Sequence, residues 1–436
     1  MSLPLATNLL CEVLVIGGGP AGMAAAQAAA SAGASVVLLD DNPALGGQIW
    51  RGGPQADVPA AATALQRGLQ ACATLRILHG AKVVGVWDAH SLLVETAAGA
   101  VRLHWQQLIL CSGARERLLP FPGWTLPGVT GAGGLQALIK GGLPVAGQRV
   151  VIAGSGPLLF AVAATARKAG ARVLRVAEQA SLAQLSAFAR KLPLWPSKLV
   201  QAVQLRDASY RTSSRVVSAQ GAGRVQAVTL QQGGRTQTLD CDRVAVGYGL
   251  VPNTRLAAAL GCALQLDDGV PAIQVDGLQA TSVPGIYAAG ECTGIGGCER
   301  ALAQGRIAGH AAVGDTQCAR SFDKERAYWS AFAAHVQRCF ALDASLRQLP
   351  QADTIVCRCE DVRHGALQGF GNWTEAKILS RCGMGACQGA VCGTAAQFLY
   401  GWDLPAPRLP FAPARLGTLA AADVVADAAG AEPTAP

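Results

Sequence analysis

The chain has 436 residues, of which 51% are hydrophobic, 15% are charged and 52 are glycine. This length predicts two or three domains with a large core, and this composition is typical of parallel α/β sheets covered on both faces. The net charge of +8 is dispersed and includes no Lys/Arg block, so nucleic acid is excluded as an expected partner.

Charge and cysteine usage also bear on where the protein resides. No charged residue lies between Glu12 and Asp40, but this stretch is rich in glycine and predicts strand, turn, helix and strand rather than a membrane span. The N-terminus lacks the basic region and cleavage site of a secretory signal. Fourteen cysteines without such a signal indicate a reducing compartment. We therefore expect a cytoplasmic protein, with at most peripheral contact with the inner face of the cell membrane.

The first predicted unit covers residues 11–115 and opens with EVLVIGGGPAGMAAAQAAASAGASVVLLDD. This run predicts a strand, a glycine loop, a helix and a second strand. Gly17 permits the tight turn, Gly19 lets the backbone approach a pyrophosphate, and Gly22 lets the helix pack on the strand. Pro20 and Ala21 lie within the same loop and are further candidate cofactor contacts.

An acidic residue follows the second strand, as a dinucleotide site requires. Asp40 is expected to accept hydrogen bonds from a ribose diol, and the adjacent Asp41 is its substitute. The run VRLHWQQLILCSGA then predicts a return strand that ends in a turn at Gly113, another candidate contact. A packing turn without a ligand is the disfavoured alternative, because strand, loop, helix and acid are all present.

The second predicted unit covers residues 120–244 and repeats the pattern in RVVIAGSGPLLFAVAATARKAGARVLRVAEQ. Its loop keeps Gly154 and Gly156 but has Leu159 in place of the third glycine, which we expect to push the helix off the strand or to alter the groove. Glu178 at the end of the next strand favours NAD(H) or an adenine nucleotide such as ATP over NADP(H). A fold unit without a ligand is an equally weighted alternative.

Residues 245–314 are expected to return to the first unit. The strand GIYAA ends at Gly290 and Glu291, and a glycine-rich loop then leads into a helix. Such a helix end can face a flavin, and Glu291 can accept from a ribityl hydroxyl. Cys292 and Cys298 flank the loop; a redox pair or second cluster is conceivable there, but two small packing residues are the favoured interpretation.

The remaining chain divides into a helical connector (315–352), a cysteine module (353–402) and an extended or disordered tail (403–436). In the module, Cys357-x-Cys359 and Cys387-x4-Cys392 supply four thiolates from two short segments, which suits a [2Fe–2S] cluster. Structural zinc is disfavoured because zinc knuckles usually use C-x2-C. Four residues also separate Cys382 from Cys387, so Cys382 is an alternative ligand in place of Cys387 or Cys392.

Other reactive constellations are missing from the sequence. The loop GGQIWRG carries no cysteine pair, the second unit has no C-x-x-C, and the six histidines are scattered. No residue is therefore assigned as a catalytic base or nucleophile.

Seven segments occur in an order that resembles one known family. They are GGGPAGMAAA, LLDDNPALGGQIWRG, CSGARERLLPFPGWTLPGV, AGSGPLLF, VGYGLVPNT, AAGECTGIGG and CRCE…GMGACQGAVC. The chain is similar to the FAD-binding alpha subunits of heteromeric amino-acid and opine dehydrogenases, such as D-hydroxyproline dehydrogenase, octopine or nopaline oxidase and hydrogen cyanide synthase. The resemblance extends from Cys11 to about Leu416.

The resemblance implies an α/β fold of two glutathione-reductase-like dinucleotide-binding domains, followed by a module similar to bacterioferritin-associated ferredoxin. It implies that FAD is held by Gly17, Gly19, Gly22, Asp40, Gly47, Gln48, Gly290 and Glu291, and that [2Fe–2S] is held by Cys357, Cys359, Cys387 and Cys392. Glu291 departs from the Asp that is usual in the wider superfamily. Cys111 and Cys382 stand where small residues without a thiol are expected.

The function that these features predict is electron transfer between two cofactors. The chain is expected to be the FAD and [2Fe–2S] subunit of an oxidoreductase whose flavoprotein beta subunit, with or without a small Fe–S subunit, oxidises the C–N bond of a D-amino acid, an imino acid such as hydroxyproline, or an opine. One alternative is a stand-alone NAD(P)H-dependent flavin reductase, which Leu159 disfavours. The other is an Fe–S sensor or scaffold with a structural flavin.

Overall fold

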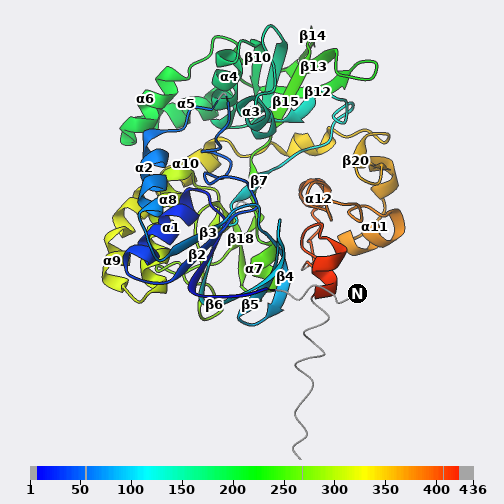
Figure 1. Ribbon diagram of the computed structural model, residues 1–436. Helices are drawn as coiled ribbons and strands as arrows, with labels where there is room; N and C mark the ends of the chain where they lie inside the picture. The colour runs from blue at the N-terminus through cyan, green and yellow to red at the C-terminus, as the bar shows by residue number, and fades with distance from the viewer. Residues whose placement is uncertain (1–6, 55, 268, 406, 422–436) are drawn as a thin grey trace, which may run out of the picture.

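The computed structural model describes residues 7–54, 56–267, 269–405 and 407–421. It is a mixed α/β protein in which two sheet-containing units lie one above the other and the C-terminal cysteine module lies beside them (Figure 1). Within this described part of the chain, none of the helices combines the length and hydrophobicity needed to cross a bilayer.

The first unit is built on a seven-stranded sheet. Its strands are β1 (Thr7–Ile16), β2 (Val36–Leu39), β3 (Leu75–Leu78), β4 (Lys82–Asp88), β5 (Ser91–Thr96), β6 (Gly99–Leu110) and β19 (Ile286–Ala288). They follow the order β3-β2-β1-β6-β5-β4, with β19 pairing parallel to β6. The predicted strands β1, β2, β6 and β19 are confirmed. The antiparallel extension β5–β4 was not predicted.

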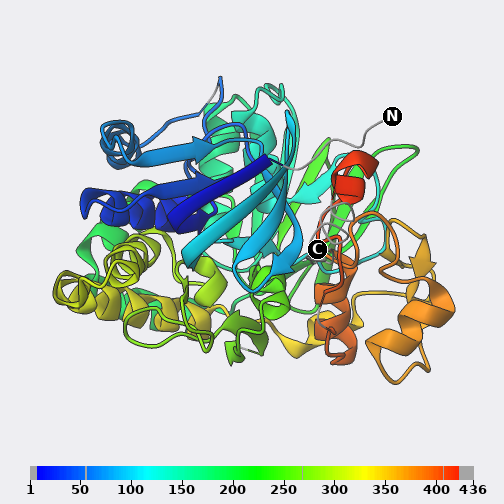
Figure 2. The same cartoon turned by 60° about the horizontal axis from the view of Figure 1, so that its bottom comes forward.

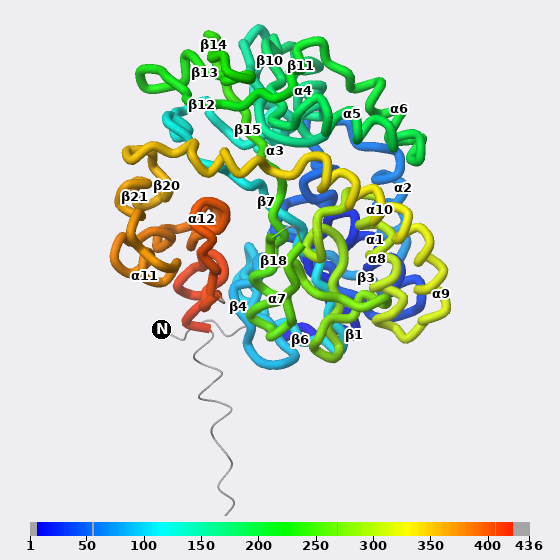
Figure 3. The backbone as a smooth tube through the Cα atoms, turned by 180° about the vertical axis from the view of Figure 1, so that it is seen from behind, coloured from blue at the N-terminus to red at the C-terminus, as the bar shows by residue number. Residues whose placement is uncertain are grey.

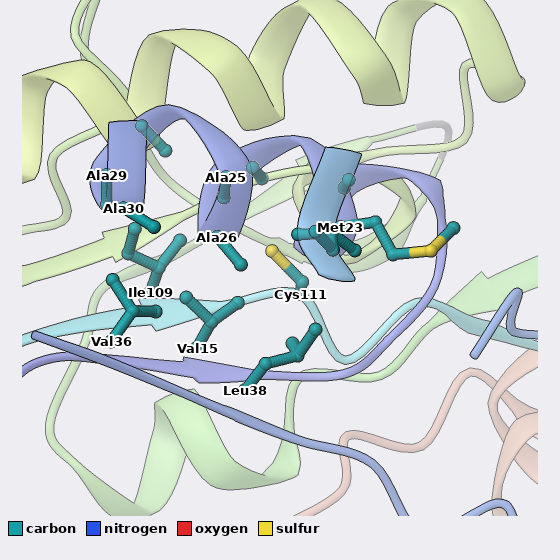
Figure 4. Close-up of a cluster of buried hydrophobic side chains, with 14 of the residues drawn as sticks. Val15, Met23, Ala25, Ala26, Ala29, Ala30, Val36, Leu38, Ile109 and Cys111 are labelled. Carbon is teal, nitrogen blue, oxygen red and sulfur yellow. The ribbon is translucent and has the colours of Figure 1, made fainter. Parts of the chain in front are cut away.

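Helices α1 (Pro20–Ser31) and α8 (Cys298–Ala312) cover one face of this sheet. Figure 4 shows the alanines of α1 lying over Val15, Val36, Leu38 and Ile109 of the strands. Small side chains let the helices approach closely, since a Cβ on Gly305 would lie only 2.2 Å from the Ala21 carbonyl oxygen. The N-terminus of α1 is therefore fixed tightly against the sheet and α8.

The second unit contains a five-stranded parallel sheet and a three-stranded antiparallel sheet. The parallel strands are β8 (Val129–Gly131), β9 (Arg149–Gly154), β10 (Arg172–Glu178), β11 (Tyr210–Arg211) and β15 (Arg243–Gly247), in the order β11-β10-β9-β15-β8. The antiparallel strands are β12 (Ser214–Gln220), β13 (Ala227–Gln232) and β14 (Arg235–Asp240).

The position of β15 corrects the expected boundary between the units at residues 244 and 245. That boundary cuts through β15, which pairs with both β9 and β8 at the centre of the second sheet. Its buried run Val244–Gly247 forms part of the core of that unit, so the chain returns to the first unit only after Gly247.

Two strands connect the units, and further helices and hairpins complete them. The connecting strands β7 (Ala114–Glu116) and β16 (Leu250–Pro252) pair antiparallel. The other elements are α2 (Ala60–Gln70), α3 (Ala132–Lys140), α4 (Leu158–Lys168), α5 (Leu182–Lys191), η1 (Leu192–Leu194), α6 (Pro196–Gln204), α7 (Arg255–Ala259), β17 (Leu264–Asp267), β18 (Val270–Ile273), η2 (Glu291–Thr293) and α9 (Thr316–Ser321).

The connector consists of α10 (Asp323–Cys339) and the short helix η3 (Ala344–Gln348). In Figure 3 it is the yellow segment that runs between the two units toward the module. The module contains β20 (Ile355–Cys357), β21 (Val362–Arg363), η4 (His364–Leu367), α11 (Trp373–Ser380) and α12 (Cys392–Tyr400). Figure 2 shows it on the side of the molecule away from α1 and α8.

The segment after the module lies along the first unit. The Phe411 amide donates to the Val84 carbonyl, and the Arg415 amide donates to the Glu95 carboxylate at 2.7 Å. Residues 416–421 form a helical turn, where an extended or disordered chain was expected. Residues 422–436 of that expected tail lie outside the described part.

Candidate functional site

The loop between β1 and α1 places three glycines in the roles predicted for them. A Cβ on Gly17, whose φ is +105°, would lie 2.2 Å from the Cys111 carbonyl oxygen, and one on Gly22 would lie 1.7 Å from the Gly17 carbonyl oxygen. A Cβ on Gly19 would have the Gly47 Cα as its nearest neighbour, at 3.9 Å, so this side of the loop is open. Pro20 is the first helical residue, and α1 has neither a side-chain cap nor an acidic residue in its first turn. The positive end of the helix is thus available to a phosphate.

Asp40 closes this loop from the end of β2. One carboxylate oxygen, Oδ2, accepts from the Gly18 amide at 2.5 Å, and Oδ1 accepts from the Asn42 amide at 2.7 Å. The Asp40 residue is buried, whereas Asp41 points outward as an exposed residue. Asp40 therefore fixes the shape of the loop and is the better placed of the two predicted acids.

Gly290 and Glu291 are brought against the same loop. A Cβ on Gly290, whose φ is +84°, would lie 2.8 Å from the Ala21 Cβ, and the Gly290 amide donates to the Gln304 side chain at 3.0 Å. Glu291 Oε1 accepts from the Gly297 amide at 2.6 Å, while its Oε2 is buried and has no hydrogen-bond partner among the described residues.

The unpaired oxygen of Glu291 is an observation that favours a ligand. Burial raises the pKa of this carboxyl, against the lowering effect of the amides that donate to it. A buried acceptor without a partner is costly, and a hydroxyl donor from a ligand would remove that cost. A ribityl hydroxyl is the donor that the sequence predicted here.

Three further predicted residues lie around this site and differ in how closely they approach its loop: Gly47, Gln48 and Gly113. A Cβ on Gly47 would lie 3.0 Å from the Gly19 Cα. Gln48 is exposed, and its Oε1 accepts from Arg51 at 3.0 Å. Gly113, with φ of +67°, has open space where a side chain would lie. The structure thus gathers the first-unit residues about one open glycine loop.

The cysteines near this site are packed thiols. Cys111 and Cys292 are buried, and burial raises the pKa of Cys292 to about 11 and that of Cys298 to about 12. Both Cys292 and Cys298 are free thiols, and Cys292 donates to the Leu110 carbonyl. Raised pKa values and backbone partners fit the packing interpretation of Cys292 and Cys298.

The loop of the second unit has a different character. Glu178 is fully buried, and its two oxygens accept from the Gly156 amide at 2.8 Å and the Ala180 amide at 2.9 Å. Leu159 is also fully buried, and a Cβ on Gly247 of β15 would lie 3.6 Å from its Cδ2, which is ordinary packing contact. The leucine that replaces the third glycine therefore packs in the core between α4 and β15.

The connector covers this second loop. Ser155 Oγ donates to the Phe340 carbonyl at 2.9 Å, and Gln179 Nε2 donates to the Ala341 carbonyl at 2.8 Å. The Asp343 amide donates back to Gln179 Oε1 at 3.0 Å. A Cβ on Gly156 would lie 4.0 Å from the Phe340 Cβ, so the space at this glycine is like that at Gly19. The difference from the first unit is that the side chains of Ser155 and Gln179 bond to the connector.

The cysteine module gathers all five of its cysteines. The Sγ atoms of Cys357, Cys382 and Cys392 lie within 4.8 Å of one another and are buried. Hydrogen bonds from Cys382 and Cys392 lower the pKa of Cys357. Cys359 is exposed and hydrogen-bonds with the half-buried Cys387. These five thiols form a buried group of three and a more accessible pair.

Tight backbone turns produce this arrangement. Arg381 and Gln388 adopt positive φ angles of +65° and +49°, and Gly383 and Gly389 adopt +83° and +77°. The Gly383 amide points at Cys357 Sγ at 3.4 Å. The loop thus wraps around the sulfur atoms with an amide directed toward them, as the sequence predicted for Gly-rich GMGACQGAVC.

One residue that the sequence did not single out ties the module to the first site. Arg115 donates through Nε to the Ala390 carbonyl at 3.0 Å and through Nη1 to Asn253 Oδ1 at 2.9 Å. The backbone amide of Asn253 in turn donates to the Gly113 carbonyl at 2.9 Å. Burial, with a smaller effect of Arg255, lowers the pKa of Arg115 to about 10. Arg115 and Asn253 therefore connect the cysteine loop to the turn at Gly113.

The two-sheet fold and its open glycine loop define a flavin oxidoreductase. Residues 11–309 match the family model for pyridine nucleotide-disulphide oxidoreductases, and the chain belongs to this family. Family membership also supports the binding of FAD, which the geometry around Gly19 and Glu291 fits.

Comparisons over the whole chain give more specific relatives. The chain is 33% identical to the HcnB subunit of hydrogen cyanide synthase from Pseudomonas protegens, covering 87% of this chain and 89% of that one. It is 32% identical to an opine oxidase subunit from Agrobacterium tumefaciens, covering 87% and 84%. These relatives confirm the family that the sequence motifs indicated.

Solved structures share the fold at lower identity. L-proline dehydrogenase from P. horikoshii has a TM-score of 0.66 at 18% identity, covering 95% of this chain and 80% of that one. Thioredoxin reductase from T. acidophilum has a TM-score of 0.53 at 23% identity, covering 71% and 99%. The first likeness spans nearly the whole chain.

Proposed function

We propose that this chain is the FAD and [2Fe–2S] electron-transfer subunit of a heteromeric dehydrogenase. In this role a partner flavoprotein oxidises a C–N bond, and this subunit passes the electrons onward. The observation that carries the proposal is the link from the cysteine loop through Arg115 and Asn253 to Gly113. It joins a site suited to flavin and a site suited to iron and sulfur within one chain.

The chain's own residues have separate tasks in this proposal. The open face of Gly19 and the free end of α1 receive the pyrophosphate, and Glu291 Oε2 receives a ribityl hydroxyl. Asp40 keeps the loop in shape through Gly18 and Asn42. When bound, a flavin accepts electrons in pairs and releases them singly, which matches a one-electron cluster.

The thiol geometry narrows the choice of cluster ligands. A [2Fe–2S] cluster needs two thiolates on each iron. Cys359 and Cys387 form one natural pair at the accessible end of the group. The second pair comes from the buried three, and we assign Cys357 and Cys392 to it. Cys382 is then a neighbouring thiol that does not bind iron.

The relatives support the proposal of a partner subunit. The hydrogen cyanide synthase and opine oxidase relatives are both named as subunits of larger enzymes. By analogy, the substrate of this complex is an amino acid, imino acid or opine. We assign its contacts to a flavoprotein beta subunit, because this chain has no identified base for C–N oxidation. A small Fe–S subunit is a further partner of this kind.

An anaerobic titration of the purified chain with NADH and with NADPH tests the proposal. Because the connector bonds to Ser155 and Gln179 over the second loop, neither nucleotide is expected to bleach the flavin. Dithionite is expected to reduce both flavin and cluster normally, as monitored by absorbance. Rapid bleaching by either nucleotide would instead identify a stand-alone reductase, and a flavin inert to every reductant would identify a sensor or scaffold.

Arg115 offers a test of the link between the two sites. Replacing it by methionine removes the bonds to Ala390 and Asn253 while retaining apolar bulk, so we expect electron transfer from photoreduced flavin to the cluster to slow by about tenfold. Flash photolysis with detection at the cluster absorbance measures this rate. The exposed Arg76 on β3, changed to methionine, is the matched control. An unchanged rate in the Arg115 variant would exclude a contribution from this link.

A further inference from the structure

A group of three reactive side chains lies outside the sites described above, at the far end of α8. His310 lies in the last turn of this helix, Asp315 precedes α9, and Cys318 lies within α9. The Cys318 Sγ is 3.3 Å from His310 Nε2, and the Asp315 Oδ2 is 3.4 Å from His310 Nδ1. The imidazole thus stands between a thiol and a carboxylate, with one ring nitrogen facing each.

The surrounding contacts hold this order in place. Asp315 Oδ1 accepts from the Cys318 amide at 3.0 Å, which fixes the carboxylate while its other oxygen faces the ring. The imidazole stacks on Phe322 with ring centroids 6.2 Å apart and an interplanar angle of 15°. The side chain of His310 is 17% exposed, and Cys318 is only partly buried. The group is therefore ordered by packing but open to a small molecule.

The order of the three groups favours an activated thiol over a metal centre. His310 Nδ1 lies 3.4 Å from the Asp315 carboxylate and has no hydrogen-bond partner among the described residues, so with its proton on this nitrogen the ring leaves the Nε2 lone pair free to accept the proton of Cys318. One imidazole nitrogen, the Cys318 Sγ and one Asp315 carboxylate oxygen lie within 4.8 Å of one another, which a metal ion could also use, but the shortest thiol and carboxylate contacts are made to opposite ring nitrogens. A carboxylate, an imidazole and a nucleophile that follow one another in space in this order activate the nucleophile in many unrelated folds.

We propose that Cys318, His310 and Asp315 form a thiol-modification site that reacts with low-molecular-weight disulfides. The Cys318 proton moves to His310 Nε2, and the thiolate attacks one sulfur of the disulfide R–S–S–R. The S–S bond of the reagent breaks as a Cys318–S–S–R bond forms, and the leaving thiolate takes the proton from His310 as R–SH. Cys318 is oxidised and half of the reagent is reduced, so no other oxidant is needed.

Alkylation of the full-length protein with iodoacetamide at pH 7 tests the activation. Peptide mass spectrometry reports the rate at Cys318 and, as an internal reference, at Cys72, a half-buried thiol whose Sγ donates only to the Gly68 carbonyl. Because an ordinary cysteine is only a few per cent thiolate at this pH, we expect Cys318 to react at least about tenfold faster than Cys72. Equal rates at the two thiols would overturn the proposal.

Two variants separate activation from structure. His310→Gln is expected to lower the Cys318 rate to that of Cys72, whereas Asp315→Asn keeps the α9 cap and is expected to slow Cys318 several-fold. The Cys72 rate serves as the folding control and should not change. Unchanged reactivity of Cys318 in His310→Gln would contradict the assignment.

Oxidised glutathione serves as the disulfide probe. We expect one added glutathione on Cys318 in the native protein and none at that position in Cys318→Ser. Zinc chloride is the competing probe, since a metal site would bind Zn²⁺ and block alkylation of Cys318. Complete protection by one equivalent of Zn²⁺ would overturn the thiol site in favour of a metal centre.

Discussion

Replacing Cys387 by serine is expected to abolish the iron–sulfur cluster while the flavin remains bound. Cys387 contacts the exposed Cys359, and we assign these two as one pair of ligands. Serine is a poor ligand for iron compared with a thiolate, so we expect iron content to fall to less than about a tenth of the wild-type value. Iron and sulfide analysis, together with visible absorbance and the EPR signal of the reduced protein, measures the loss.

The matched control is the serine variant of Cys382. This thiol is buried beside Cys357 and Cys392, so the same Cys-to-Ser change is made within the module, next to two of the assigned ligands. We expect Cys382→Ser to keep a full cluster. Loss of iron in this variant, with retention in Cys392→Ser, would move the second pair of ligands to Cys357 and Cys382. A cluster that survives Cys387→Ser would contradict the proposed site as a whole.

The sequence predicted the parts of this protein that depend on neighbouring residues. The spacing and the flanking apolar runs placed Gly17, Gly19 and Gly22 between a strand and a helix, and at Gly17 and Gly22 a Cβ would clash with the backbone. The same holds for Glu291 after β19, although its unpaired Oε2 became visible only once the loop at Gly297 was placed. Local pattern therefore indicated where a flavin site lies, and the structure added the free acceptor.

Contacts between distant segments could not be predicted in this way. Ser155 and Phe340, which join the second loop to the connector, are 185 residues apart, and Arg115 and Ala390 are 275 residues apart. Neither contact leaves a periodic or spaced signal in the sequence. The boundary inside β15 was missed for a related reason. A buried apolar strand has the same residue pattern at the centre of either sheet, so the pattern does not show to which unit the strand belongs.

The two glycine loops show how similar sequence patterns can have different roles. In the first unit the face at Gly19 is open, while in the second unit Ser155 and Gln179 bond to the connector. The second unit thereby supports the segment that leads to the cysteine module. We infer that the dinucleotide fold of this unit is retained because it positions the module. In agreement with this role, both Glu178 oxygens accept from the unit's own Gly156 and Ala180 amides.

Replacing Gly19 by valine is expected to remove FAD binding without unfolding the protein. Gly19 has a φ of −74°, which any residue adopts, and a Cβ there meets only the Gly47 Cα at 3.9 Å. The added side chain would occupy the open face of the loop, where the pyrophosphate must approach the backbone. We expect FAD affinity to fall on the order of 100-fold, equivalent to about 3 kcal/mol.

Fluorescence titration of the apoprotein with FAD measures this loss, and thermal melting of the same apoprotein reports its stability. Gly52→Val is the matched control, because a Cβ on Gly52 meets nothing within 4 Å and its φ is outside the left-handed region. The control is expected to bind FAD like the wild type, and both apoproteins are expected to melt at nearly the same temperature. Wild-type affinity in Gly19→Val would place the pyrophosphate elsewhere, since valine at this position leaves no room for it against the loop.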